Sequence, residues 1–278
     1  MDQSEKKEIR VAILDLYEGE ANQGMRCIRE IIAAQSKESG ITITYDEFDV
    51  RRKLELPDLS YDAYISSGGP GSPTESEGMQ WEIKFFNWIK QTEDYNNNIL
   101  NEIKKPVLFI CHSFQLACRY YNIGKVCKRR STSFGVFPVH MLEEAFAEPL
   151  FEGLSDPFYV VDSRDYQVIS PDAERLQQLG AAVLCIEKER PYVPLERSLM
   201  AVRFNEHFIG TQFHPEADAL SMGQYLQQAD KKQAVIHEHG EAKWQSMVEQ
   251  LQDPDKIIKT YHTILPNFLS SIIGVAVV

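Results

Sequence analysis

The first part of the chain alternates between short apolar runs and longer amphipathic segments. The runs at 11–16 and 106–110 are predominantly apolar, which is typical of strands buried in a parallel sheet. Residues 41–50 alternate between apolar and polar side chains, and residues 61–66 form another short run that ends in a Gly/Pro-rich turn. The pattern therefore predicts four strands before residue 111.

Two amphipathic helices are predicted between these strands. One begins at Asn22, and the other carries Trp81, Phe85 and Trp88 on one face as core packing. Residues 92–102 are polar and predict a loop. This β-α-β order predicts a flavodoxin-like α/β fold, with a mostly parallel sheet flanked by helices.

The rest of the chain divides into a β-rich part and a helical part. Several β-type segments between 126 and 212 predict strands that extend the sheet, and the chain from 218 onward has a helical, polar pattern. We expect one domain over 1–217 with an added β portion. The helical extension over 218–278 should pack on the same domain, because it has too few apolar positions for a core of its own.

Charge and cysteine content narrow the partners and the compartment. The 278 residues include 29 Lys and Arg against 41 Asp and Glu, a net charge of −12, which disfavours binding to nucleic acid or an anionic membrane. The polar N-terminus predicts no signal peptide, and no apolar run is long enough to span a bilayer. Five cysteines without Cys-x-x-Cys spacing predict reduced thiols in the cytoplasm and no structural zinc site.

The candidate chemistry begins at Cys111, which follows the predicted strand 107–110 and precedes a helix. A cysteine at such a turn is exposed at the sheet edge, and the helix N-terminus stabilises a thiolate and a developing oxyanion. The alternative is a buried core cysteine, which is the more common role of a free cysteine.

A second candidate lies in the sequence Ile209-Gly-Thr-Gln-Phe-His-Pro-Glu216, where a predicted strand runs into His214. The imidazole would then reach the same sheet edge as Cys111, and Glu216 would orient it. The alternative is a surface His-Pro turn with a solvated glutamate.

The third candidate is the turn at 67–73, with the sequence Ser-Gly-Gly-Pro-Gly-Ser-Pro, whose glycines let backbone N–H groups converge on an anion. The alternative is a simple sharp turn. Neither this turn nor the glycine-containing segment 19–24 completes a nucleotide-binding motif, so no cofactor or metal is expected.

Taken in this order, the three features resemble the class I glutamine amidotransferases over roughly residues 10–216. The resemblance implies that Cys111 is the nucleophile, His214 the general base and acid, and Glu216 the carboxylate that orients the imidazole. It also implies an oxyanion hole made by the backbone N–H groups of Gly69 and His112.

Two further residues of the strand-to-helix turn around Cys111, the elbow, bear on substrate binding. By the resemblance, Gln115 helps to hold the substrate. Phe109 and Ser113 stand where the family usually has glycines. We expect Phe109 either to point into the substrate pocket and narrow it, which would disfavour free glutamine as the substrate, or to brace the helix that follows Cys111.

The implied reaction is Cys-dependent hydrolysis of the γ-amide of glutamine or of a γ-glutamyl compound. It proceeds through a γ-glutamyl thioester and releases ammonia or an amine, as in the glutaminase domain of GMP synthase and in γ-glutamyl peptidases. No fused synthase is expected, so the partner is a separate synthase subunit or none, and a homo-oligomer stays open. The alternative is a non-catalytic binding or regulatory protein that retains the fold, favoured by the lost elbow glycines.

Overall fold

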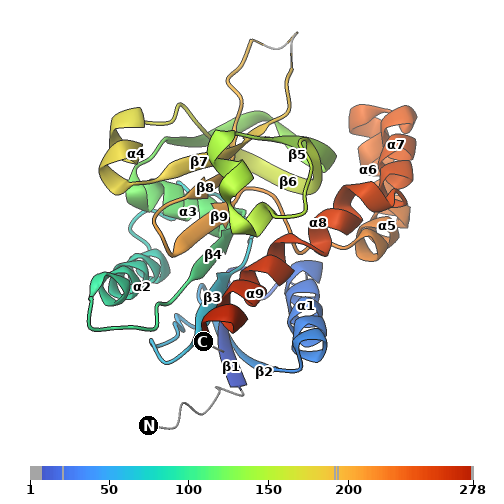
Figure 1. Cartoon of the computed structure of the whole chain (residues 1–278). Helices are drawn as coiled ribbons and strands as arrows, with labels where there is room; N and C mark the ends of the chain where they lie inside the picture. The colour runs from blue at the N-terminus through green and yellow to red at the C-terminus, as the bar shows by residue number, and fades with distance from the viewer. Residues whose placement is uncertain (1–7, 21, 191, 193, 277–278) are drawn as a thin grey trace.

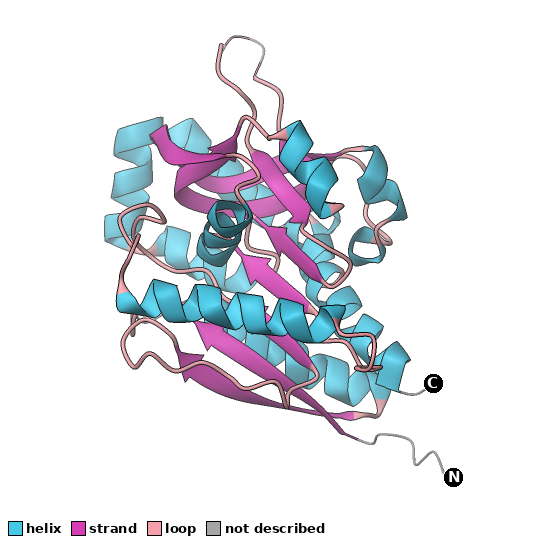
Figure 2. Cartoon of the chain, turned by 90° about the vertical axis from the view of Figure 1, so that its left-hand side faces the viewer, coloured by secondary structure: helices cyan, strands magenta, loops and turns pink. Residues whose placement is uncertain are grey.

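A nine-stranded sheet forms the centre of the computed structural model, which describes residues 8–20, 22–190, 192 and 194–276. Along the sheet the strands follow the order β2-β1-β3-β4-β9-β8-β7-β5-β6. Helices lie on both faces of the sheet, as Figure 1 and Figure 2 show. The expected fold class, an α/β sheet flanked by helices with an added β portion, is confirmed.

Five adjacent strands make up the parallel half of the sheet. They are β1 (Glu8–Asp15), β2 (Thr42–Asp49), β3 (Ala63–Ser66), β4 (Val107–Ile110) and β9 (Phe208–Thr211). The helices of this half are α1 (Gln23–Ser39), α2 (Gln80–Asn97) and α3 (His112–Tyr121). Because β4 and β9 pair in register from Val107↔Phe208 to Ile110↔Thr211, the segments that follow them leave the sheet side by side.

The antiparallel half continues the sheet from β9. Its strands are β8 (Leu199–Arg203), β7 (Ala182–Glu187), β5 (Lys125–Met141) and β6 (Phe158–Ile169). Its short helices are η1 (Glu143–Ala147), η2 (Pro149–Phe151) and α4 (Ala173–Leu179). The backbone N–H of His214 donates to the carbonyl of Val161 at 3.0 Å, which ties the segment after β9 to β6.

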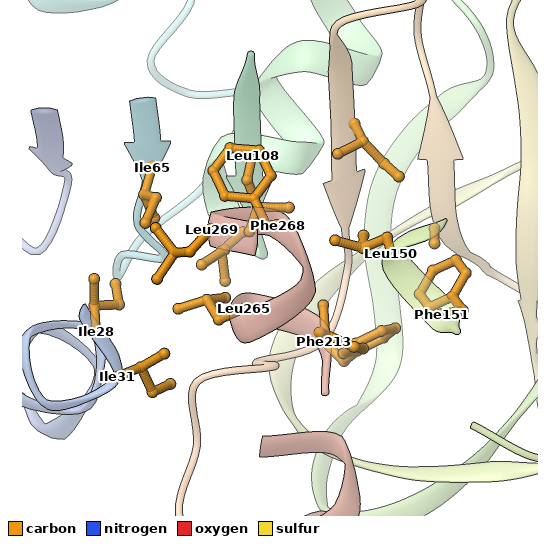
Figure 3. Close-up of a cluster of buried hydrophobic side chains, with 14 of the residues drawn as sticks. Ile28, Ile31, Ile65, Leu108, Leu150, Phe151, Phe213, Leu265, Phe268 and Leu269 are labelled. Atoms are coloured by element: carbon orange, nitrogen blue, oxygen red, sulfur yellow. The ribbon is translucent and has the colours of Figure 1, made fainter. Parts of the chain in front are cut away.

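Two apolar clusters fill the two faces of the sheet. Side chains alternate along β1, so that Val11 and Ile13 join one cluster while Ala12 and Leu14 join the other. The first cluster lies under α1 and η2 and includes Leu265 and other side chains of α9 (Ile264–Ala276) (Figure 3). The second lies under α2 and α3.

The C-terminal part is helical, as predicted. After α5 (Ala219–Gln227), α6 (Ala229–His239) and α7 (Glu241–Leu251), the chain passes through η3 (Pro254–Ile258) and α8 (Lys259–Tyr261) to α9. Helices α5–α7 lie beside β5 and β6 (Figure 1), where Leu226 and Met247 pack with Val136 and Val161. Because α9 shares the main core, we propose that 218–278 extends the domain formed by 1–217.

One predicted boundary is wrong. Residues 92–102 are polar, yet α2 continues to Asn97. The hydroxyl of Thr92 donates to the carbonyl of Trp88 at 2.9 Å, and the Asn96 side chain exchanges two hydrogen bonds with the backbone of Lys105. These buried polar groups are satisfied within the fold, so their polarity does not indicate exposure.

In the part of the chain that the structure describes, no helix has the length and apolar character needed to cross a membrane.

Candidate active site

Cys111 lies at a sharp turn between β4 and α3. Its backbone has φ 50° and ψ −99°, a region that non-glycine residues rarely occupy and that is associated with functional sites. The hydroxyl of Ser113 accepts from the N–H of Ile110 and contacts the carbonyl of Ser66, each at 2.8 Å. Ser113 therefore replaces the usual glycine with side-chain hydrogen bonds that hold the turn.

The structure brings Cys111, His214 and Glu216 together at one edge of the sheet. Cys111 and His214 are neighbours in the wall of one cavity, because a Cβ at Gly68 would lie 3.5 Å from Cβ of Cys111 and 2.8 Å from Cε1 of His214. On the other side of the ring, Nδ1 of His214 lies 2.8 Å from Oε1 of Glu216, whose side chain is 1% exposed. A cysteine, a histidine and a buried carboxylate that lie together in this order can activate a sulfur nucleophile.

The electrostatics of the three groups favour a charged imidazole. Burial alone would lower the pKa of His214, but the negative charges of Glu216 and Cys111 and the hydrogen bonds to both hold that pKa well above its usual range. An imidazolium beside a thiol stabilises the thiolate, which is the reactive form of cysteine.

The Gly68–Pro73 turn is held against the reaction centre. A Cβ at Gly69 would lie 2.4 Å from the carbonyl oxygen of Leu16, so this position cannot hold a side chain. The guanidinium of Arg51 donates to the carbonyls of Pro70 at 2.7 Å and Leu16 at 3.3 Å and thereby fixes the turn. His112 is the first residue of α3, so its N–H has no partner within the helix.

We predict that Gly68→Ala lowers kcat/KM by about 10²-fold, the loss expected from a displacement of about 1 Å. A Cβ at this position would lie 2.8 Å from Cε1 of His214 and 3.5 Å from Cβ of Cys111, so the imidazole must move. Gly274→Ala is the matched control, because a Cβ there meets nothing within 4 Å. Steady-state kinetics of both variants check the prediction, and equal activities would contradict the placement of the imidazole.

A cavity of about 900 Å³ opens at this edge of the sheet, within the size range of ligand sites. Cys111, His112, His214, Gly69 and Gln115 all line it. The amide of Gln115 donates to Oε1 of Gln212 at 3.1 Å and to the carbonyl of Tyr166 at 3.3 Å, which fixes its orientation. The predicted substrate-binding position of Gln115 is therefore at the cavity wall.

The sequence analysis missed other residues of this site. Tyr17 lines the cavity. Its hydroxyl lies next to both Gly24 and Gly68, and therefore beside Cys111 and His214. Burial and the charges of Glu216 and Cys111 raise the pKa of Tyr17 well above its usual value, so the phenol stays a hydrogen-bond donor. Tyr17 follows β1 as Cys111 follows β4, and the strand-end rule that indicated Cys111 also applies to it.

Phe109 does not line the cavity, so the expectation that it narrows the substrate pocket is wrong, and its position favours the alternative of packing under the helix after Cys111. Its side chain is fully buried in the cluster under α2 and α3, with edge-to-face contacts to Phe85, Phe204 and Phe208. Alternation along a strand would put residues 109 and 111 on one side. The positive φ of Cys111 breaks that alternation and turns its side chain into the opposite cluster.

We predict that Phe109→Ala lowers the free energy of unfolding by about 3–5 kcal/mol, as for other buried Phe truncations. Because Phe109 does not reach the cavity, KM of the folded fraction should stay within about twofold of the wild-type value. Urea denaturation and steady-state kinetics test the two parts separately. A changed KM at unchanged stability would place Phe109 at the substrate.

Within the described residues, no group of three or more His, Cys, Asp and Glu side chains could hold a metal ion. Burial and the nearby Arg51 and Arg119 lower the pKa of His112 to about 3, so its imidazole is neutral. Burial and the hydrogen bond to Asp218 raise the pKa of Cys27, which also lines the cavity, to about 12.

The profile of the family Glutamine amidotransferase class-I matches residues 25–233, three quarters of the chain. The chain belongs to the class-I glutamine amidotransferase family. The matched region contains Cys111, His214 and Glu216 and extends into α6.

Known proteins agree with this membership. Aminodeoxychorismate synthase of Saccharomyces cerevisiae is 24% identical over 245 residues, 87% of this chain and 29% of that protein. GMP synthase [glutamine-hydrolyzing] of Coxiella burnetii is 26% identical over 201 residues, 70% of this chain and 32% of that protein. The chain thus spans about a third of the length of these curated relatives.

Solved structures show the same fold at low sequence identity. A glutamine amidotransferase from Thermotoga maritima superposes with a TM-score of 0.63 at 19% identity, covering 95% of this chain and 98% of that one. The glutaminase domain of CTPS from Trypanosoma brucei, with bound acivicin, superposes with a TM-score of 0.53 at 16% identity. That match covers 75% of this chain and 86% of that one.

Proposed function

We propose that this amidotransferase hydrolyses the γ-amide of glutamine or of a γ-glutamyl compound, with Cys111 as the nucleophile. The observation that carries the proposal is that Cys111, His214 and the buried Glu216 meet at the wall of a ligand-sized cavity, with Nδ1 of His214 2.8 Å from Oε1 of Glu216. The thiolate attacks the γ-carbonyl, and His214 gives its proton to the leaving ammonia or amine. The resulting γ-glutamyl thioester is then hydrolysed by water that His214 deprotonates.

The developing oxyanion has two backbone donors in this proposal. The N–H of His112 starts α3, where the helix dipole favours negative charge, and the N–H of Gly69 belongs to the turn that Arg51 fixes. The hydrogen bond between Glu216 and His214 keeps the imidazole oriented through both halves of the reaction. Gln115, which Gln212 orients through a hydrogen bond of 3.1 Å, holds the glutamyl group at the cavity wall.

The size of the cavity favours γ-glutamyl compounds beside free glutamine. Its volume of about 900 Å³ lies near the upper end for small-molecule sites, and glutamine is a small amino acid. Ser221, Met222 and Gln224 of α5 form part of its wall. We infer that this part of the cavity accommodates the leaving amine of a bulkier substrate.

The elbow geometry weakens the rival proposal of a non-catalytic protein. That proposal depended on the two lost glycines, but Ser113 holds the turn by hydrogen bonds and Phe109 lies in the core.

A separate synthase subunit that receives ammonia is part of our proposal. The five cysteines are free thiols, which supports a reducing compartment such as the cytoplasm.

The test is product release by the full chain from glutamine and from a series of γ-glutamyl amides, with hydroxylamine added to trap the thioester as a γ-glutamyl hydroxamate. We expect ammonia or amine release together with the hydroxamate, and faster release when a cognate synthase is added if ammonia is the product. No release from any substrate, or release without a trappable intermediate, would overturn the proposal.

A further inference from the structure

A second, smaller cavity of about 150 Å³ lies next to the candidate active site. Side chains of β5, β6 and the segment after β7 surround it, including Arg129, Phe137 and Lys188. Thr132 lines both cavities, so the two are neighbours. The small cavity cannot hold a nucleotide or a peptide, but a phosphate or small carboxylate group fits within it.

The carboxylates that line this cavity are already neutralised. Oε1 of Glu187 accepts from Arg129 and Oε2 from Arg190, each at 3.0 Å. Asp162 accepts from Nε of Arg164 at 2.8 Å and 2.9 Å. Both carboxylate side chains are more than nine-tenths buried, which makes these pairs strong and leaves no charge for further cations.

Two lysines add positive charge, and neither forms a salt bridge with a carboxylate of the described residues. Nζ of Lys188 lies 4.2 Å and Nζ of Lys243 4.5 Å from the ring centroid of Phe137. Burial, together with Arg190 and Arg129, lowers the pKa of Lys188 despite the attraction of Glu187. Burial and the charge of Lys188 likewise lower the pKa of Lys243. The ring stabilises both ammonium groups only in part.

An unused donor points to a missing acceptor. Nε of Arg190 is buried and has no hydrogen-bond partner among the described residues, although the side chain lines the cavity. A buried, unpaired donor on a charged group is costly, and a bound anion would satisfy it. The site as a whole has five cationic side chains and two carboxylates: Arg129, Arg164, Lys188, Arg190 and Lys243 against Asp162 and Glu187.

We propose that this cavity binds a small dianion, a phosphate or dicarboxylate group, through Lys188 and Arg190, with the charge of Lys243 beside them on the ring of Phe137. Such an anion would neutralise the cations that the two carboxylates leave unpaired and would accept from Nε of Arg190. Binding of the anion does not depend on the proposed function, whereas its effect on catalysis does.

The site is close enough to the reaction centre for the two to be coupled. Asp162 lines the small cavity, and the carbonyl of the next residue, Ser163, lies 3.9 Å from Sγ of Cys111. Thr132, shared by both cavities, hydrogen-bonds to Asp165, which lines the large one. The anion is therefore either free in solution and acts on the neighbouring site, or is carried by the leaving amine of the substrate.

Binding is tested on the full chain with Cys111→Ala, so that no catalysis is needed. Inorganic phosphate is titrated by calorimetry at constant ionic strength, with chloride as the reference salt. We expect saturable binding that weakens by at least about tenfold, or about 1.4 kcal/mol, in Lys188→Gln/Lys243→Gln. The matched control is Lys232→Gln, because Lys232 also stacks on a ring, 3.8 Å from the centroid of Trp244, but that ring, unlike Phe137, does not line the cavity.

Equal binding in the double variant and the control, or no saturable binding at all, overturns the site. Enzyme kinetics then separate the two sources of the anion. A free anion is expected to change the turnover of glutamine when phosphate is added. A substrate-borne anion is expected to make phosphate competitive with anionic γ-glutamyl amides, and the double variant should raise KM for these substrates alone. Bound phosphate with neither kinetic effect would overturn the coupling to the active site.

Discussion

Cys111→Ala is expected to lower kcat by at least about 10⁴-fold, because the reaction then has no nucleophile for the thioester. Folding should be retained. The residue is buried, but its hydrogen bonds to the Ser163 carbonyl and the Gln212 amide are weak, since Sγ lies 3.9 Å from each. Alanine is also no more strained than cysteine at φ 50°. Turnover and thermal unfolding of the purified variant check both statements.

The control for this variant is Cys127→Ala. Cys127 is a half-buried thiol on β5 and lies outside the cavity. Its turnover should equal that of the wild type. If Cys111→Ala kept wild-type turnover while Cys127→Ala lost it, the nucleophile would be elsewhere. A loss of folding in Cys111→Ala would be visible as a lowered melting temperature and would require Cys111→Ser, which keeps the volume of the side chain.

The positions of the proposed catalytic groups could be predicted because each follows a strand of one parallel half-sheet. Cys111 comes directly after β4, His214 follows β9, and the Gly68 turn follows β3. These three strands are neighbours in the sheet, so their ends meet at one edge. Local patterns of apolar residues were sufficient for this conclusion, since strand order in such folds is strongly constrained.

Features that depend on backbone geometry or on distant contacts could not be predicted in this way. The direction of Phe109 follows from the φ of Cys111, which alternation along a strand does not reveal. The network around Glu187 joins it to Arg129, 58 residues earlier, across two strands whose pairing the sequence does not specify. Buried arginines on such strands look like exposed polar positions until β5, β6 and β7 are placed together.

The second large effect is expected for Glu216→Gln, which should lower kcat/KM by about 10²–10⁴-fold. The negative charge of Glu216 is a principal cause of the raised pKa of His214, so its removal lowers that pKa. The proposed active form has a thiolate and an imidazolium, and it is lost when the imidazolium deprotonates. The alkaline limb of the kcat/KM profile should therefore move to lower pH in the variant.

Glu206→Gln is the matched control, because Glu206 forms the same kind of pair on the surface. Its carboxylate is 88% exposed and lies 3.8 Å from Nε2 of His207, outside the cavity. Its pH profile should coincide with that of the wild type, since solvent screens an exposed pair.

Glu216 Oε2 is buried without a hydrogen-bond partner among the described residues, so the isosteric glutamine removes the charge with little change in packing. A Glu216→Gln profile with an unshifted alkaline limb would show that Glu216 does not sustain the charge of His214.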